Sequence, residues 1–405
     1  MRDISKYKEI LKEDYESFAG PDWPPYTQFI KHENVEAFVY AEIDEFVKNY
    51  TKFADPAFCV LPFYGTELPK KIVCCLMKPG NTDEVKKQML SGIRPDACSV
   101  CWHLEDAGLV SDRILKNNTL DYYANCDLSL LYNDAKKNST TTISYKIDTS
   151  SVCNATCVTF SGSFSSAWRR LEKKHTGISN NTFPNITSKQ AQGLINFSTA
   201  KMINFRGGEP LLSETNFLIL RELVNCGNTD CFISFTTNGS IIPNTQQLEI
   251  LSMFSHVNFN ISIDGLGPVF EYLRYPLRWA TILKTIDFCK NQNYDISVSY
   301  TLSNLNVLYH TKTTEWFKQN SLNYNMNSVS HPTYFRPSAL SQTLKSKILS
   351  KDSNPEITAF LQHHSTIDET DFEKFKIEIA KQDKWKNIVI NDFMPELIEL
   401  IKQDE

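Results

Sequence analysis

Residues 200–240, AKMINFRGGEPLLSETNFLILRELVNCGNTDCFISFTTNGS, contain one complete repeat of a strand, a helix and a strand. Two β-rich apolar runs, at 200–205 and 231–237, flank the amphipathic pattern ETNFLILRELVNC. Strands that alternate with helices at this spacing predict a parallel sheet with crossover helices. Both runs are followed by polar and glycine residues, which therefore fall at the carboxyl ends of neighbouring strands.

The same alternation extends over much of the chain. Further β-rich runs occupy 143–150, 256–263 and 295–302, and helical patterns occupy 165–174, 245–254 and 278–292. The predicted fold class is α/β: a partial (β/α)6-type barrel with parallel strands, preceded by a small cysteine-rich module. We expect four parts, namely a helical N-terminal segment, the cysteine-rich module, the barrel and a helical tail, at 1–50, 51–131, 140–335 and 336–405.

Composition narrows the class of protein. The 405 residues carry a formal net charge of -5, so no bulk basicity indicates a nucleic-acid partner. The N-terminal stretch MRDISKYKEILKEDYESF is charged and amphipathic, unlike a signal peptide. No apolar run approaches the roughly 20 residues of a membrane span. We expect a cytoplasmic protein without a membrane partner.

The chain contains eleven cysteines. Because a reducing compartment disfavours disulfides, clustered cysteines there more often ligate a metal. Cys98 and Cys101 form a C-x2-C turn, and Cys59 and the Cys74–Cys75 pair precede it. Four thiolates suit zinc or an iron–sulfur cluster, and the spacing does not separate the two. Neighbouring strand residues point to opposite faces, so one of the pair faces the site, and we favour Cys75. Four scattered cysteines are predicted to be buried small hydrophobes: Cys126, Cys226, Cys231 and Cys289.

Polar groups gather at the predicted strand ends. Gly207, Gly208, Glu209 and Pro210 follow one run, and the glycine pair permits close approach of a ligand to the backbone. Later runs end with equivalent groups, namely Asn238, Ser262 and Asp264. Polar clusters at successive strand ends are typical of a ligand site at the edge of a parallel sheet.

One more motif follows the run at 143–150. Cys153 and Cys157 begin the stretch CNATCVTFSGSFSSAW, in which a C-x3-C-x2-C pattern would place a third cysteine at position 160. Phe160 stands there instead.

The order of these motifs resembles the radical S-adenosylmethionine (SAM) superfamily. The matching text is the Cys153–Cys157 pair followed by GGEP, TTNG, SIDG and EYLRYPLRW. The segments FCVLPF, CCL and MLSGIRPDACSVCWHLEDAGLVSDR are similar to the superfamily's twitch/SPASM-type auxiliary-cluster domain. Together the resemblances cover residues 58 to 305.

The resemblance implies a set of cofactors. Three cysteines of the family hold a [4Fe–4S] cluster that binds SAM, and Cys153 and Cys157 match two of them. Glu209 within the GGEP segment would receive the methionine ammonium. The other strand-end cofactor residues, Asn238, Ser262 and Asp264, would lie along the SAM pocket, the first two near the ribose or carboxylate. An auxiliary iron–sulfur cluster, of the [4Fe–4S] type, would be held by Cys59, Cys75, Cys98 and Cys101.

The sequence departs from the family at the catalytic motif. Phe160 has no electron pair for iron, and Thr159 replaces a hydrophobic or aromatic residue often found beside the adenine. Without the cluster, SAM receives no inner-sphere electron and no 5′-deoxyadenosyl radical forms.

Three hypotheses follow. The first is a radical enzyme with a substitute ligand such as Cys126, a peptide or protein substrate, and a flavodoxin or ferredoxin as electron donor. The second is a non-radical SAM-binding pseudoenzyme. The third is a metal-stabilised module that binds a peptide or protein partner.

Overall fold

The computed structural model describes residues 57–68, 82–98, 101–102, 105, 112–178, 186–329, 332–352, 354, 357, 361 and 369–404. The expected N-terminal helical segment and the Cys74–Cys75 pair lie outside these residues. The described chain forms one seven-stranded sheet, parallel throughout, whose strands follow one another in chain order. The strands are β1 Gly65–Leu68, β2 Ser144–Asp148, β3 Met202–Arg206, β4 Phe232–Thr237, β5 Val257–Ser262, β6 Asp295–Leu302 and β7 Asn323–Ser328.

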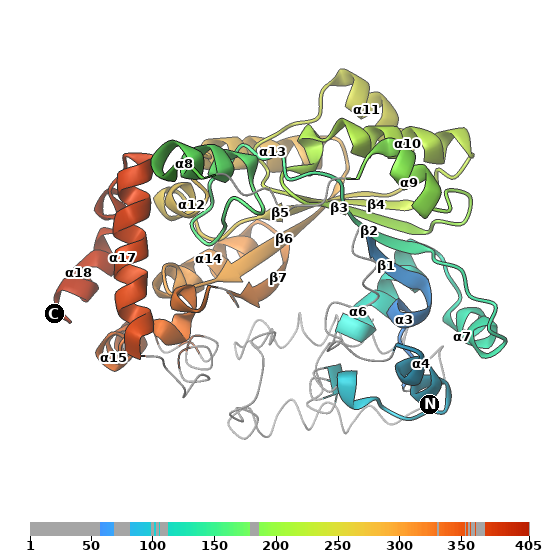
Figure 1. The fold of residues 1–405 in the computed structure, drawn as a ribbon, viewed down its shortest axis with the longest axis horizontal. Helices are drawn as coiled ribbons and strands as arrows, with labels where there is room; N and C mark the ends of the chain where they lie inside the picture. Colours follow the sequence, from blue (N-terminus) through green and yellow to red (C-terminus); the bar gives the residue numbers. More distant parts are fainter. Residues whose placement is uncertain are drawn as a thin grey trace.

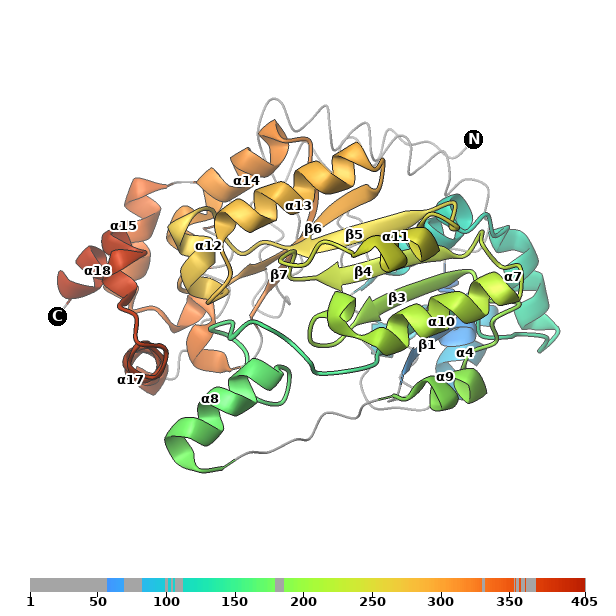
Figure 2. The ribbon, with the colours of Figure 1, turned by 90° about the horizontal axis from the view of Figure 1, so that it is seen from above.

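Helices connect the strands and cover the sheet. Figure 1 shows α9, α10, α11 and α13 along the upper side of the sheet, α3, α4, α6 and α7 near β1, and α15, α17 and α18 at the opposite end; Figure 2 shows the same arrangement from above. The helices are α3 Leu61–Tyr64, α4 Thr82–Leu90, α6 Asp112–Asn118, α7 Leu128–Lys136, α8 Ser166–Thr176, α9 Ser188–Leu194, α10 Glu214–Asn225, α11 Thr245–Leu251, α12 Pro268–Leu273, α13 Trp279–Asn291, α14 His310–Gln319, α15 Gln342–Lys351, α17 Glu369–Lys386 and α18 Pro395–Lys402.

The α/β class and the parallel strand order agree with the expectation. The expected strands at 143–150, 200–205, 231–237, 256–263 and 295–302 correspond to β2 to β6, and the three expected crossover helices and the helix at 165–174 are also present. Each of these strands and helices has a clear periodicity of apolar residues and ends in polar or glycine residues. A sequence pattern of this kind is sufficient to predict a strand or a helix.

The N-terminal module differs from the expectation in two respects. β1 lies within residues 51–131 and pairs in parallel with β2 from Gly65↔Ser144 to Leu68↔Ile147, so this part of the chain shares the sheet with the barrel. In addition, the apolar run FCVLPFYG at 58–65 predicts a short β segment, but it contains α3. Pro62 occupies the first turn of α3, where a missing N–H costs nothing, whereas a strand would lose a ladder donor there.

Strand register is fixed by a row of aromatic side chains. Phe205 of β3 pairs with Phe235 of β4, which pairs with Phe259 of β5. Their ring centroids are 5.2 and 5.7 Å apart, and all three side chains are fully buried. Phe217 of α10 packs on Phe235 at 6.1 Å. Slippage of one strand by one residue would turn its aromatic ring to the other face of the sheet, so this row strongly specifies the register.

Phe235→Ala should lower the free energy of unfolding by about 3–5 kcal/mol, because the substitution opens a cavity at the centre of the row. Phe160→Ala is the matched control: its ring is 48% exposed, and we expect a change within about 0.5 kcal/mol. Urea denaturation of both variants measures the difference. Equal losses would show that the row does not carry the stability assigned to it.

Candidate functional site

The cysteine loop follows β2 at the carboxyl edge of the sheet. Cys153 and Cys157 are both buried. The loop docks on the end of α12 and on the residues after it, because Val158 N donates to Leu273 O at 2.8 Å and Thr156 N donates to Tyr275 O at 2.6 Å. Burial raises the pKa of Cys157 to about 11, although the Arg274 guanidinium opposes this shift. Burial therefore disfavours the Cys157 thiolate, whereas the Arg274 guanidinium favours it.

The glycine pair after β3 docks on the same loop. Gly208 N donates to Ser150 O at 2.8 Å, and Glu209 N donates to Val152 O at 2.7 Å. A Cβ at Gly207 would lie 2.4 Å from Ser150 O, and one at Gly208 would lie 2.3 Å from Val152 O. Gly207 also has a φ of +110°, which side chains rarely adopt. The glycines are therefore required by contact between two segments of the chain itself.

Glu209 lies beneath this contact and is 1% exposed. Its Oε1 accepts hydrogen bonds from Thr237 Oγ1 at 2.7 Å and Leu211 N at 3.2 Å. Its Oε2 accepts from Asn238 N at 2.8 Å. Burial raises the pKa of Glu209 to about 6, against the lowering effect of these hydrogen bonds. The carboxylate thus joins the end of β3 to the end of β4, and its contact with a methionine ammonium stays a prediction. Pro210 begins a 3₁₀ turn, Pro210–Leu212, directly after it.

Asn238 links the end of β4 to the cysteine loop. Its Nδ2 donates to Asn154 Oδ1 at 2.8 Å and lies 3.9 Å from Cys153 Sγ. Asn154 Nδ2 in turn donates to Ser240 Oγ at 2.9 Å. The structure thus brings together the cysteine pair, the glycine pair, Glu209 and Asn238, which come from three separate stretches of sequence.

The next two strands complete this edge. Ser262 is the last residue of β5, and Asp264 follows it. Asp264 Oδ2 pairs with Arg274 at 2.8 Å, and its Oδ1 accepts a hydrogen bond from Thr301 N at 2.9 Å. Asp264 therefore holds the buried Arg274 guanidinium close to Cys157, in addition to any contact with a ligand.

Helix α17 supplies two site residues that sequence reasoning missed. Gln382 Nε2 donates to Val158 O at 2.9 Å, inside the cysteine loop. Lys386 Nζ donates to Gln382 Oε1 at 2.8 Å and lies 4.7 Å from the Trp168 ring centroid. Burial lowers the pKa of Lys386 to about 7, while Cys157 acts in the opposite direction. More than 200 residues separate the two segments, so no local pattern could have indicated the contact.

The third position of the cysteine motif provides no ligand. Phe160 is half exposed, and its ring lies against Phe164 with centroids 5.8 Å apart. Within the described part of the chain, no three His, Cys, Asp or Glu side chains form a group that could hold a metal ion. The substitute ligand considered above, Cys126, packs in a different hydrophobic cluster from Cys153 and Cys157. The residues present do not fit a three-thiolate iron cluster.

Among the described residues, the expected thiols of the N-terminal module do not form a group that could hold a metal ion. Cys59, Cys98 and Cys101 are buried, and the pKa of Cys59 is raised by burial and further by the other two thiols. Arg113 opposes this shift. Its guanidinium donates to Phe58 O at 2.7 Å and forms a buried ion pair with Glu105. The predicted fourth ligand, Cys75, lies outside the described residues.

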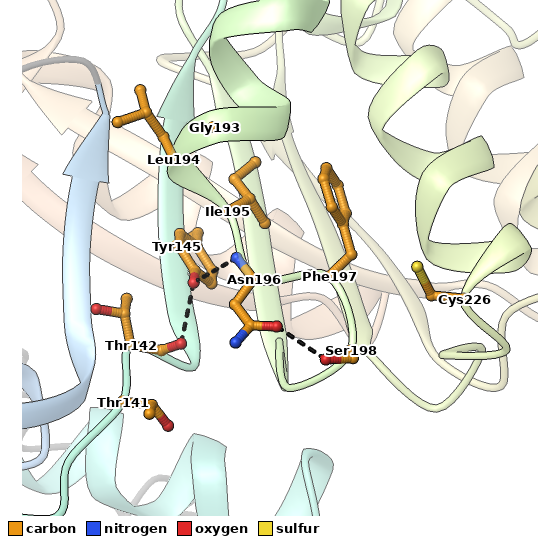
Figure 3. Close-up of a pocket in the computed structure, with 10 residues that line it drawn as sticks. All are labelled: Thr141, Thr142, Tyr145, Gly193, Leu194, Ile195, Asn196, Phe197, Ser198 and Cys226. Atoms are coloured by element: carbon orange, nitrogen blue, oxygen red, sulfur yellow. Dashed lines mark hydrogen bonds between the residues drawn. The ribbon is translucent and has the colours of Figure 1, made fainter.

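Three of the four scattered cysteines are buried as expected, but Cys226 is exposed. Cys226 and Tyr145 line an open hollow (Figure 3). The Tyr145 hydroxyl donates to Thr142 O and accepts from Asn196 N, both at 3.0 Å. Thr142 precedes β2, so this hollow lies at the amino end of the sheet, away from the cysteine loop. We assign no function to it, because its hydrogen-bonding groups bond to one another.

Comparisons with known proteins define no family. No family model matches the chain, and no curated protein matches it. Solved structures to which the chain is similar include anSMEcpe with bound AdoMet, at 17% identity and a TM-score of 0.39 over 51% of this chain and 61% of that one. Another is SuiB of Streptococcus suis, at 14% identity and a TM-score of 0.38 over 66% and 60%. The chain thus spans about three fifths of each of these proteins.

Among the helices that the structure describes, none combines the length and the hydrophobicity that a membrane span requires.

Glu209→Gln should lower the free energy of unfolding by about 1–3 kcal/mol at pH 7, because an amide N–H₂ group would then face the Asn238 N–H donor. Glu249→Gln on α11 is the control, since Glu249 is exposed and should tolerate the same change. Chemical denaturation measures both. A Glu209→Gln variant as stable as the control would show that the carboxylate does not join the two strand ends.

Proposed function

We propose that this protein binds SAM at the carboxyl edge of its sheet but does not cleave it reductively. One observation carries the proposal: the cysteine loop, the glycine pair and Asn238 meet at one edge of the sheet. Gly208 and Glu209 contact Ser150 and Val152, and Asn238 contacts Asn154. These are the segments whose order resembles the radical SAM superfamily, and they converge in space although the chain separates them widely.

The loss of the radical step is inferred from Phe160. A benzyl side chain cannot ligate iron, and two thiolates are a poor anchor for a cluster that must leave one iron open to SAM. One donor remains for a polar ligand near Cys157: Arg274 Nε, which is buried and has no hydrogen-bond partner in the described part of the chain. We assign the protein to SAM binding without electron transfer, with a peptide as the proposed class of substrate or partner.

We also propose that Cys59, Cys75, Cys98 and Cys101 hold an auxiliary iron–sulfur cluster. Three of these thiols are buried, and burial raises the pKa values of Cys59 and Cys98, an effect that the positive charge of Arg113 opposes. A nearby cation favours the thiolate, which is the form that ligates metal. The cluster would contribute stability to the residues around β1.

A second candidate function is a metal-stabilised module that binds a peptide or protein partner and no nucleotide. Glu209 favours it, because both carboxylate oxygens already accept hydrogen bonds from the protein. The two candidates differ in one property, the binding of SAM at the carboxyl edge.

Anaerobic reconstitution should load iron and sulfide for one cluster per chain. Cys98→Ala should abolish this loading and Cys153→Ala should leave it unchanged, because only the N-terminal thiols are expected to form a full ligand set. Iron and sulfide analysis with electronic spectra measures the stoichiometry. Two clusters per chain, one of them lost in Cys153→Ala, would show that another residue supplies the third ligand and would refute the inferred loss of the radical cluster.

The reconstituted native protein should yield no 5′-deoxyadenosine from SAM and dithionite, whereas Phe160→Cys should yield it, since the substitution supplies the missing thiolate. Phe164→Cys, at a neighbouring exposed position of the same loop, is the matched control and should stay inactive. Chromatography of the products measures both. If Phe160→Cys loads a second cluster but forms no 5′-deoxyadenosine, the edge does not hold SAM productively and the proposed function fails.

A further inference from the structure

Helix α17 carries a stripe of polar residues where it meets the cysteine loop. Glu378, Gln382 and Lys386 follow one another at intervals of four residues, so they lie along one side of the helix. Gln382 and Lys386 are buried, and Glu378 is half-buried. A helix held by packing alone would gain more from apolar side chains, such as its own Phe375 and Ile379, because a buried polar group costs free energy unless it is hydrogen-bonded. The stripe therefore indicates a role other than packing.

The amide of Gln382 uses both of its ends. Its Nε2 donates to Val158 O at 2.9 Å and to Glu378 Oε1 at 3.0 Å. Its Oε1 accepts from Lys386 Nζ at 2.8 Å. Since the nitrogen and the oxygen face different partners, the amide cannot turn over without losing all three hydrogen bonds. A buried network that is satisfied in this way holds one defined arrangement, so Glu378 and Lys386 fix the direction in which Gln382 reaches the cysteine loop.

Asp383, the next residue of α17, holds the segment on which the cysteine loop docks. Tyr272 of α12 is buried, and its hydroxyl donates to Asp383 Oδ1 at 2.7 Å. The other carboxylate oxygen, Oδ2, accepts from Ile390 N at 2.8 Å. Leu273 follows Tyr272 directly, and its carbonyl accepts the hydrogen bond from Val158 N. Two consecutive residues of α17 therefore hold the two segments that bond to each other at the cysteine loop.

Aromatic contacts join α17 to α8 as well. Trp385 stacks on His175 with ring centroids 5.2 Å apart, and Lys386 Nζ lies 4.7 Å from the Trp168 ring centroid. Trp168 Nε1 in turn donates to Cys157 O at 2.8 Å. Figures 1 and 2 both show α17 beside α8. The helix thus contacts α8, α12 and the cysteine loop.

We propose that Gln382 and Asp383 are positioning residues for SAM binding, which hold the cysteine loop against α12 in the shape that accepts the ligand. The two segments include groups of the carboxyl edge: Asn154 of the loop accepts from Asn238 at 2.8 Å, and Arg274 follows α12. If the contacts with α17 were lost, the loop could move away from α12 although every side chain of the edge were retained. This inference rests on the proposed function, because it concerns the same ligand.

The first test is isothermal titration of the full chain with SAM. Gln382→Glu replaces the N–H group that faces Val158 O with a carboxylate oxygen, and we expect it to weaken SAM binding at least about 10-fold. Tyr272→Phe removes one hydroxyl and should weaken binding about 3-fold or more. Tyr309→Phe is the matched control, since it also removes a tyrosine–carboxylate hydrogen bond, with Glu396 at 3.0 Å, and should change the affinity less than about 2-fold.

Hydrogen–deuterium exchange at saturating SAM gives a readout that a general loss of stability would not reproduce. In the native chain, SAM should slow exchange at 378–386 as well as at the carboxyl edge, because coupling between the ligand and the helix is reciprocal. In Gln382→Glu the slowing at 378–386 should disappear, whereas the slowing at 206–212 and 237–240 should remain.

Several outcomes would overturn the proposal: native SAM affinity in Gln382→Glu, an equal loss of affinity in Tyr309→Phe, or slowing at 378–386 that persists in Gln382→Glu. If Gln382→Glu does not fold, native affinity in Tyr272→Phe overturns it instead. If the native chain binds no SAM, the proposed function fails, and exchange in the ligand-free chains then decides the positioning of the loop. Faster exchange at 154–158 in Gln382→Glu would support it, and unchanged exchange there would overturn it.

Discussion

The register of the parallel strands is the constraint on which the site depends. Phe205, Phe235 and Phe259 lie side by side in β3, β4 and β5, and their burial fixes which residues end each strand. Because the strands are parallel and in register, the residues that follow them meet at one edge. Contact between the cysteine loop, the glycine pair and Asn238 is a consequence of this packing. A displaced strand would separate them, even if every side chain were retained.

The edge itself is held by buried charge. Glu209 accepts three hydrogen bonds where β3 and β4 end, and Asp264 holds the Arg274 guanidinium beside Cys157. Lys386 of α17 approaches Cys157 from the other side, over the ring of Trp168. The Arg274 guanidinium and the Lys386 amine, whose pKa burial lowers to about 7, thus both lie near Cys157. This environment suits an anionic group, either a thiolate or a ligand carboxylate, and it persists although Phe160 has removed the third thiol position.

Local patterns predicted β2 to β6, their crossover helices and the convergence of the strand-end motifs, because each relies on short-range periodicity and on the geometry of parallel strands. β7 was not predicted. Its sequence NYNMNS alternates as a strand does, but asparagine has a low β-propensity and hides the alternation. The pairing of β1 with β2 and the contact of Gln382 with Val158 depend on tertiary packing over long separations.

The central claim is that the carboxyl edge binds SAM without a three-thiolate cluster. Hydrogen–deuterium exchange of the full chain, with and without millimolar SAM, tests it most directly. The account predicts slower exchange at residues 150–158, 206–212 and 237–240, and no change around Tyr145 at the amino end of the sheet. Unchanged exchange at the carboxyl edge would contradict it.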